Sequence, residues 1–278
     1  MIGVIVVVIV IIGIFAASAG FYSNNDSSST IITYGETTFN NQQYKSIVDD
    51  YFVSQSNVNL NEATNEIITA NEVNAISGGI SHQTYNSNQI FSSALVDLSR
   101  TNNLEINVDQ SKITLVTQQM YASALQSAGI NQGYVVVTSP VSATGESALA
   151  GIMNCYEDAT NTTIPTEVKQ AANNQIYTES EVVNSSNVSA DSVSDLVDEV
   201  KEEVNQTNTT NVNSIIDIIT QVAQERGLNL TQADIEKLAE SISQTQSVQS
   251  QAQDYNQQIS QSINNVAGSF SFGNLFNF

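Results

Sequence analysis

The spacing of apolar residues changes near residue 160, and this change constrains the fold more than any other feature of the chain. Before it, short β-branched and aromatic runs alternate with stretches in which apolar residues recur every three or four positions. Beyond Pro165 only the helical spacing remains. Strands alternating with helices are typical of sheets covered by helices. We therefore predict an α/β domain with a mixed sheet over residues 30–160, followed by an all-α region over 161–267.

Strands are predicted where apolar residues run together or alternate with polar ones. Runs of strand composition lie at 31–34, 67–68, 91–98 and 134–138. The last of these is continuously apolar, which favours a central strand covered on both faces. Residues 104–108 and 113–115 alternate on either side of a polar turn at 109–111, and this pattern predicts an antiparallel hairpin.

Helices are predicted between these strands. One spans about 39–52 and buries a face of Tyr44, Ile47, Val48, Tyr51 and Phe52. A short helix follows at 72–76, and two more are predicted at 118–128 and 145–156. The first of these two begins at a Thr117 cap and ends at Gly129, because Thr accepts from free N–H groups and Gly adopts the left-handed conformation at helix ends.

The all-α region contains several amphipathic helices. Pro165 suits the first turn of one, and 212–226 forms another that ends at Gly227. A third helix, near 191–204, buries its Val and Leu side chains and turns its acidic side chains toward water. Thr231 and Asp234 resemble a capping box.

Apolar residues at 248, 252, 255, 259, 263 and 266 then form a seam that must pack against something. Two readings stay open for this seam: packing against helices of the same chain, or a homo-oligomeric coil. The tail at 268–278 is rich in aromatic residues and has no helical register.

Residues 1–17 are an unbroken run of apolar residues and glycine, followed by Ser-Ala-Gly. This length suits either a short membrane-spanning helix or a signal peptide cleaved before Gly20, and no Lys or Arg precedes the run to distinguish them. We therefore expect a signal or anchor helix over 1–20 that contacts the membrane. A polar linker over 21–29 would follow, with the rest of the chain outside the cytoplasm.

Composition excludes several kinds of partner. The chain has 28 acidic and 7 basic residues, a formal net charge of −21, one Cys and one His. Such a polyanion repels nucleic acid. A single Cys cannot form an intrachain disulfide, and one Cys with one His cannot complete a tetrahedral zinc site. No cofactor is expected.

Seven Asn-x-Ser/Thr sequons lie outside the 30–160 core. They are Asn25, Asn161, Asn184, Asn187, Asn205, Asn208 and Asn229. This distribution predicts exposed acceptors for glycosylation if the protein is exported. The alternative is chance occurrence in a chain rich in Asn, Ser and Thr.

No assembled catalytic set is visible, so no catalytic or metal-binding residue is assigned. Residues 145–149 follow a strand like a nucleophile elbow, but Leu149 stands where Gly is required. The turn at 139–145 has no Lys like that of a P-loop. His82 is expected to be structural, Cys155 a buried inert thiol, and the acidic cluster at 191–203 a solvated helix face rather than a Ca²⁺ site.

Three segments resemble a known family. The stretch 113–129, with its Thr-x-x-Met-Tyr-x-x-Ala-Leu-x-x-Ala-Gly pattern, the strand 135–140 and the segment 142–152 are similar to the YpuA-like exported proteins. The resemblance covers most of the chain after residue 30. It implies a secreted or membrane-tethered protein with no established activity, cofactor or catalytic residues.

The sequence thus favours a non-enzymatic surface protein that offers a protein or cell-envelope partner its C-terminal helices. One alternative is an extracytoplasmic hydrolase or wall-modifying enzyme, in which two carboxylates converge in a cleft of the 30–160 domain. Another is an oligomeric structural element built on the seam at 248–266.

Overall fold

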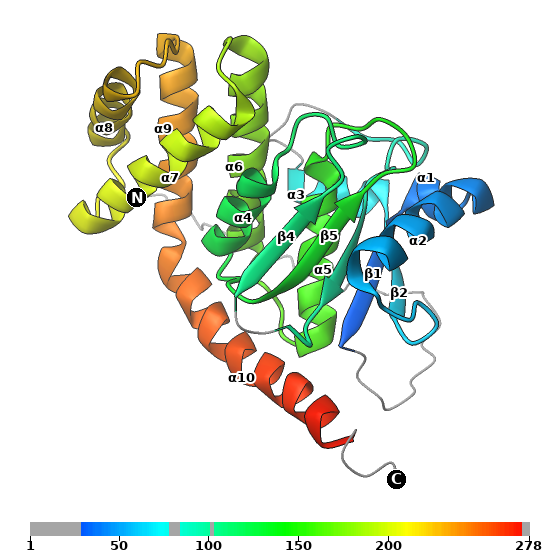
Figure 1. The fold of residues 1–278 in the computed structure, drawn as a ribbon. Coiled ribbons are helices and arrows are strands. Elements are labelled where there is room, and N and C mark those ends of the chain that lie inside the picture. Colours follow the sequence, from blue (N-terminus) through cyan, green and yellow to red (C-terminus); the bar gives the residue numbers. More distant parts are fainter. Residues whose placement is uncertain (1–28, 78–83, 101–102, 274–278) are drawn as a thin grey trace, which may run out of the picture.

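The computed structural model describes residues 29–77, 84–100 and 103–273, with only the backbone course given for 265–273. In this part of the chain, five strands form one mixed sheet and helices make up the whole C-terminal half (Figure 1). The strands are β1 (Thr30–Gly35), β2 (Thr64–Ile68), β3 (Ser93–Asp97), β4 (Leu104–Val108) and β5 (Gly133–Thr138), in the order β2-β1-β3-β5-β4. A mixed sheet followed by an all-helical region is the predicted fold class.

The sheet consists of two parallel pairs joined by an antiparallel centre. β1 pairs in parallel with β2, and β4 pairs in parallel with β5, whereas β3 runs antiparallel to both of its neighbours. Parallel neighbours need a crossover connection, and helices supply it on each side. α1 (Glu36–Phe39) and α2 (Gln42–Ser56) connect β1 to β2, and α4 (Gln118–Ser127) connects β4 to β5.

The predicted antiparallel hairpin over 104–115 is wrong. β4 instead pairs in parallel with β5, with Ile106 opposite Val135. After β4 the chain turns at Asp109, whose carbonyl accepts from the backbone N–H of Lys112 at 2.9 Å. Ile113 then forms an isolated parallel bridge with Ala143. Alternation has a period of two in both kinds of pairing, so the pattern did not specify the partner.

Both faces of the sheet are covered. Val96, Val135 and Val137 point to a core shared with α4, α5 (Glu146–Thr160) and α6 (Thr166–Ser185). Their strand neighbours point to the opposite face, where Val48 and Phe52 of α2 cover them. α2 and α5 accordingly lie on opposite sides of the sheet in Figure 1. The prediction that β5 is covered on both faces is confirmed, because its residues are all buried.

One residue of the predicted α2 face is misplaced. Ile47 is 39% exposed, whereas Val48 and Phe52 are fully buried. Val48 and Phe52 are four residues apart and so lie on one line of the helix facing the sheet. Ile47 is rotated by about 100° from Val48 and lies at the flank of this contact.

Three of the remaining helices form a second core, namely α7 (Ala190–Thr207), α8 (Val212–Glu225) and α9 (Gln232–Ser247). α3 (Ala70–Ser77) instead packs near β2, and α10 (Gln249–Gly273) follows α9. Apolar side chains of α7, α8 and α9, such as Leu196, Ile219 and Leu238, make this core. The Thr231–Asp234 capping box of α9 is present as predicted, and Pro165 lies at the N-cap of α6.

α10 belongs to the sheet core rather than to this second core. The seam residues Ala252, Tyr255, Ile259 and Ile263 are buried in the same cluster as the α4 and α5 side chains. Figure 1 shows α10 leaving the group α7–α9 and running along the sheet half. The seam therefore packs within its own chain, as the first of the two readings expected.

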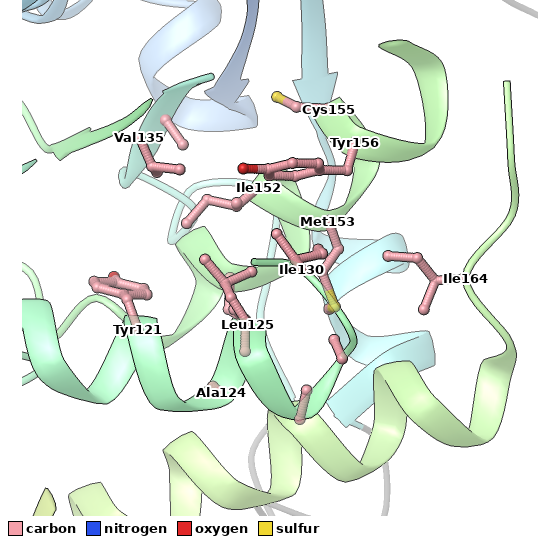
Figure 2. Packing of buried hydrophobic residues seen from close by; sticks show 14 of the residues in the cluster. Tyr121, Ala124, Leu125, Ile130, Val135, Ile152, Met153, Cys155, Tyr156 and Ile164 are labelled. Carbon is pink, nitrogen blue, oxygen red and sulfur yellow. The ribbon is translucent and has the colours of Figure 1, made fainter. Parts of the chain in front are cut away.

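The segments that carry the family resemblance pack against one another in the sheet core. Figure 2 shows Tyr121 and Leu125 of α4 with Ile152 and Met153 of α5 nearby. The Tyr121 hydroxyl donates to the Gly145 carbonyl at 2.5 Å. The conspicuous pattern at 113–129 and 142–152 thus joins α4 to the start of α5, which is a structural role.

The predicted signal or anchor helix over 1–20 and most of the linker lie outside the described residues. Among the helices that are described, none combines the length and apolar character needed to cross a bilayer. The prediction that the tail at 268–278 has no helical register is wrong for residues 268–273, whose backbone continues α10.

Candidate functional site

A polar groove of about 920 Å³ lies where the sheet half meets the helical half. Its walls come from the end of α4, from α7, from the junction of α9 and α10, and from Arg226 just after α8. Helices distant in sequence meet here because α10 packs back onto the sheet core. We call this feature the groove.

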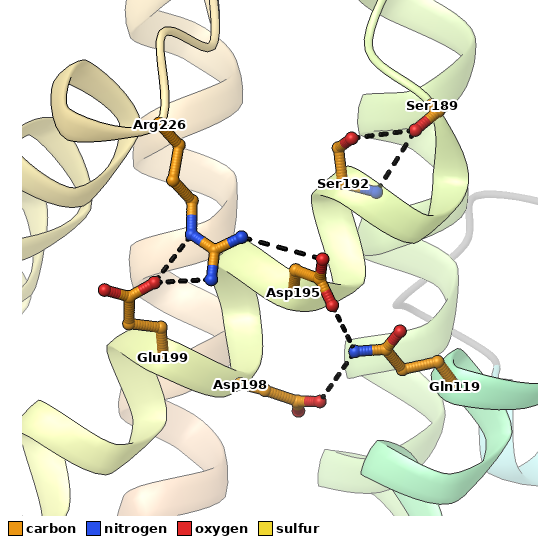
Figure 3. A network of polar contacts seen from close by, with 7 residues as sticks. All are labelled: Gln119, Ser189, Ser192, Asp195, Asp198, Glu199 and Arg226. Atoms are coloured by element: carbon orange, nitrogen blue, oxygen red, sulfur yellow. Dashed lines mark hydrogen bonds and ion pairs between the residues drawn. The ribbon is translucent and has the colours of Figure 1, made fainter.

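One wall of the groove is a stripe of carboxylates on α7. Asp195, Asp198, Glu199 and Glu202 recur at three- and four-residue steps, so they share one face of the helix. As predicted, these side chains reach water, with Asp195 46% exposed and Glu199 38% exposed, but three of the four also have protein partners. Gln119 of α4 donates to Asp195 at 2.6 Å and to Asp198 at 3.4 Å (Figure 3).

Arg226 is already matched by this acidic stripe. Its guanidinium lies 2.5 Å from Glu199 and 3.6 Å from Asp195. Figure 3 shows the two ion pairs. These pairs are partly exposed, with 36% of the Arg226 side chain accessible, so each contributes little stability. Their consequence is electrostatic, because the two carboxylates beside Arg226 offset its positive charge and make it less attractive to an anion.

Lys201, the other cation that lines the groove, has its ammonium held by groups of α4. Its Nζ donates to the Ser127 hydroxyl at 2.7 Å, the Ser123 hydroxyl at 3.0 Å and the Ser123 carbonyl at 3.2 Å. Ser123 in turn bonds Asp198, and Gln175 of α6 donates to Ser123 at 2.8 Å. This network joins α4, α6 and α7 at the groove wall.

A fully buried carboxylate, Glu179 of α6, adjoins the Lys201 network. Its Oε1 accepts from Gln175 Nε2 at 2.9 Å. Burial raises the pKa of Glu179, and the charge of Lys201 opposes this effect. Burial also lowers the pKa of Lys201, against the opposing charges of Asp198 and Glu179. Desolvation penalises both charged forms, so the two groups depend on each other.

Glu179→Gln is expected to flatten the pH dependence of stability. A folded-state pKa above the ordinary value of 4.5 means that the unfolded chain releases this proton first as pH rises. The contribution of Glu179 to the free energy of unfolding therefore falls above pH 4.5, by at most about 1.4 kcal/mol per pH unit, until its raised pKa is passed. Urea unfolding measures the free energy of unfolding of both proteins. The value for E179Q minus the value for wild type should grow over this pH window and then level off.

The control for this prediction is Glu181→Gln. Glu181 lies two residues further along α6, is 42% exposed and pairs with Lys237 at the surface. E181Q should show no such growth with pH. If the E179Q and wild-type curves ran parallel, Glu179 would not titrate abnormally.

A second wall of the groove is a stripe of amides on α10. Gln249, Gln253 and Gln257 are spaced by four residues and line the groove together. Gln249 donates to Asn205 of α7 at 2.7 Å, and Asn256 donates to the Gly129 carbonyl at 2.7 Å. Within the described residues, the Gln253 and Gln257 side chains make no hydrogen bond, so their amides face the groove unengaged.

The structure does not bring the other sequence candidates together as a site. Ser147 is 9% exposed at the start of α5, and its neighbours line the core as small-residue packing would require. The turn before it is hydrogen-bonded to the segment 112–116. Cys155 is buried beside the Ile31 carbonyl, and burial raises the pKa of its thiol to about 12, as expected of an inert thiol. His82 lies outside the described residues.

Six of the seven sequons are visible, and their Asn side chains are exposed. They are Asn161, Asn184, Asn187, Asn205, Asn208 and Asn229, whereas Asn25 lies outside the described residues. Asn205 also lines the groove, so a glycan at this position would occupy the space beside Gln249. Within the described residues, no three His, Cys, Asp or Glu side chains gather as a metal site requires.

Sequence reasoning missed both Lys201 and the amide stripe. Lys201 directly follows the buried Val200 and lies four residues after the buried Val197, so it borders the apolar face of α7. This position could have predicted that the Lys201 side chain packs against neighbouring helices rather than extending into water. The four-residue spacing of the three Gln residues on α10 was visible as well, but it stands in a stretch where Gln is common.

These features define a class of protein: a mixed α/β sheet joined to a helical half, with a polar groove at the junction. The chain belongs to the family described as "Protein of unknown function (DUF1002)", whose model matches residues 34–262. It is 32% identical over 130 residues to the "Uncharacterized protein YpuA" of Bacillus subtilis (strain 168). That alignment covers 47% of this chain and 44% of the relative. No solved structure matches the chain significantly.

Proposed function

We propose that the chain is an exported surface protein, secreted or tethered to the membrane through residues 1–20, and that it binds a partner in the groove without catalysing a reaction. The groove carries this proposal. It is a concave site built by several helices, and its walls combine carboxylates with amides that are free to form hydrogen bonds. The apolar run at 1–17 and the polar linker after it support export.

The carboxylates of the groove are poorly arranged for glycoside hydrolysis. Gln119 contacts both Asp195 and Asp198, so the two bonded oxygens lie within about 6 Å of each other, near the glycosidase range of roughly 5–9.5 Å. However, the two residues are three apart on one helix and lie side by side. A glycosidase needs carboxyl groups that flank the scissile bond. This geometry favours binding over hydrolysis at the groove, whose carboxylates lie on α7 rather than in the 30–160 domain of the hydrolase alternative.

An oligomeric structural role has less support than binding. The seam proposed for it is buried in the sheet core from Val248 to Ile263. Those side chains are not available to a second copy unless α10 detaches. The proposal therefore assigns the partner to the groove rather than to the seam.

Site-specific photo-crosslinking in intact cells tests the binding role. A photoreactive phenylalanine analogue at Gln253 faces the groove, whereas the same analogue at the exposed Gln251, two residues away on α10, does not line it. A discrete adduct from position 253 and none from 251 is expected. Equal adducts from both positions, or none from either, would contradict a groove-binding function.

The export part of the proposal has its own measurement. Protease added to intact cells should degrade the chain, and mass spectrometry of the native N-terminus should then distinguish a start at Gly20 from an intact residue 1. Protection of the whole chain until the cells are lysed would contradict export.

A further inference from the structure

The two walls of the groove are chemically different, and this difference indicates what it binds. α7 presents carboxylates, whereas α10 presents uncharged amides. Both stripes follow helical spacing, so each is a continuous row along its helix. A ligand lying between them would meet negative charge on one side and paired donors and acceptors on the other.

The charge available to a ligand is negative. Arg226 is paired with Glu199 and Asp195, and the Lys201 ammonium donates to the Ser123 and Ser127 hydroxyls. Glu202 is exposed, and within the described residues it makes no hydrogen bond or ion pair. The lining contains four carboxylates and two basic side chains, so an incoming cation is favoured over an anion.

The amide row fits a peptide backbone. A Gln side chain offers both a carbonyl acceptor and an NH₂ donor, the same pair that each backbone peptide unit needs. Gln253 and Gln257 are not engaged with other described side chains, so they can pair with a ligand. The span from Asp195 to Glu202 is about 10 Å along the helix axis, which matches about three residues of extended chain.

We propose, building on the groove-binding function above, that the ligand is an extended, basic polypeptide segment. Its Lys or Arg side chains face the carboxylates of α7, and its backbone pairs with the amides of α10. The formal charge of −21 on the whole chain attracts such a segment over long range, while the groove decides where it binds.

Fluorescence anisotropy with the full-length protein and a labelled (Lys-Ser)₄ peptide tests this proposal. Saturable binding that weakens with rising salt is expected, with no binding of (Glu-Ser)₄. Glu202→Lys should raise the dissociation constant of the (Lys-Ser)₄ complex at least about tenfold, because it reverses an unpaired charge in the groove. Glu203→Lys makes the same change in net charge at a neighbouring α7 residue outside the lining, and it should weaken binding less than about threefold.

Each other result overturns the proposal in a recognisable way. Equal effects of E202K and E203K would mean that the peptide is held by net charge rather than by the groove. Binding of spermine without binding of (Lys-Ser)₄ would mean that the ligand is a polyamine. Tight binding of (Glu-Ser)₄ would mean that the groove prefers negatively charged ligands. If no peptide binds while position 253 still crosslinks in cells, the ligand class is wrong and the groove-binding function stands.

Discussion

Replacing Gly129 by alanine is expected to lower the free energy of unfolding by about 3 kcal/mol or more. Gly129 has a φ of +81°, which L side chains rarely adopt. A Cβ built on it would lie 2.1 Å from the Ala252 carbonyl oxygen, which belongs to the α10 backbone and cannot rotate away. The strain of the backbone and the clash therefore add, and α10 must shift away from α4.

The matched control is Gly227→Ala. Gly227 also has a positive φ, +66°, but a Cβ there would meet no atom within 4 Å. G227A should lose only the backbone term, about 1 kcal/mol. Urea unfolding of the two variants thus separates close packing from backbone strain. Equal losses of the free energy of unfolding would mean that the α10 backbone does not lie in close contact with Gly129.

Gly129 also illustrates what local sequence could and could not predict. Its role as the end of α4 was predictable, because a helix end depends on residues within one turn. Its close approach to Ala252 was not, because that contact joins segments more than a hundred residues apart. The Thr117 and Thr231 caps were predicted for the same local reason and are present in the structure.

The wrong pairing predicted for β4 and the failure to predict the groove have one cause. Alternation at 104–108 predicts a strand correctly, but it does not say which strand will pair with it. Likewise, the seam of α10 predicts an amphipathic helix without naming the surface that it covers. The groove exists only because α10 covers the sheet core, so its lining could not be assembled from the spacing of residues within any one helix.

Lys201→Met is expected to lower the free energy of unfolding by about 3–5 kcal/mol, the range found when one partner of a buried ionic group is removed. Methionine keeps most of the side-chain volume, so the loss reflects the ammonium rather than a cavity. Without it, Ser123 and Ser127 lose a donor, and the carboxylates of Glu179 and Asp198 lose the nearby positive charge. The contacts between α4, α6 and α7 should loosen together.

Lys237→Met provides the control, because Lys237 pairs with Glu181 at 2.8 Å while 52% of its side chain is exposed. Water solvates such a pair well, so K237M should lose less than about 1 kcal/mol. At a pH above the raised pKa of Glu179, adding Glu179→Gln to Lys201→Met removes the carboxylate that was left uncompensated, so the double variant should recover part of the loss. If K201M were no worse than K237M, or if E179Q gave no recovery, the Lys201 ammonium would not be the buried tie between the sheet half and the helical half.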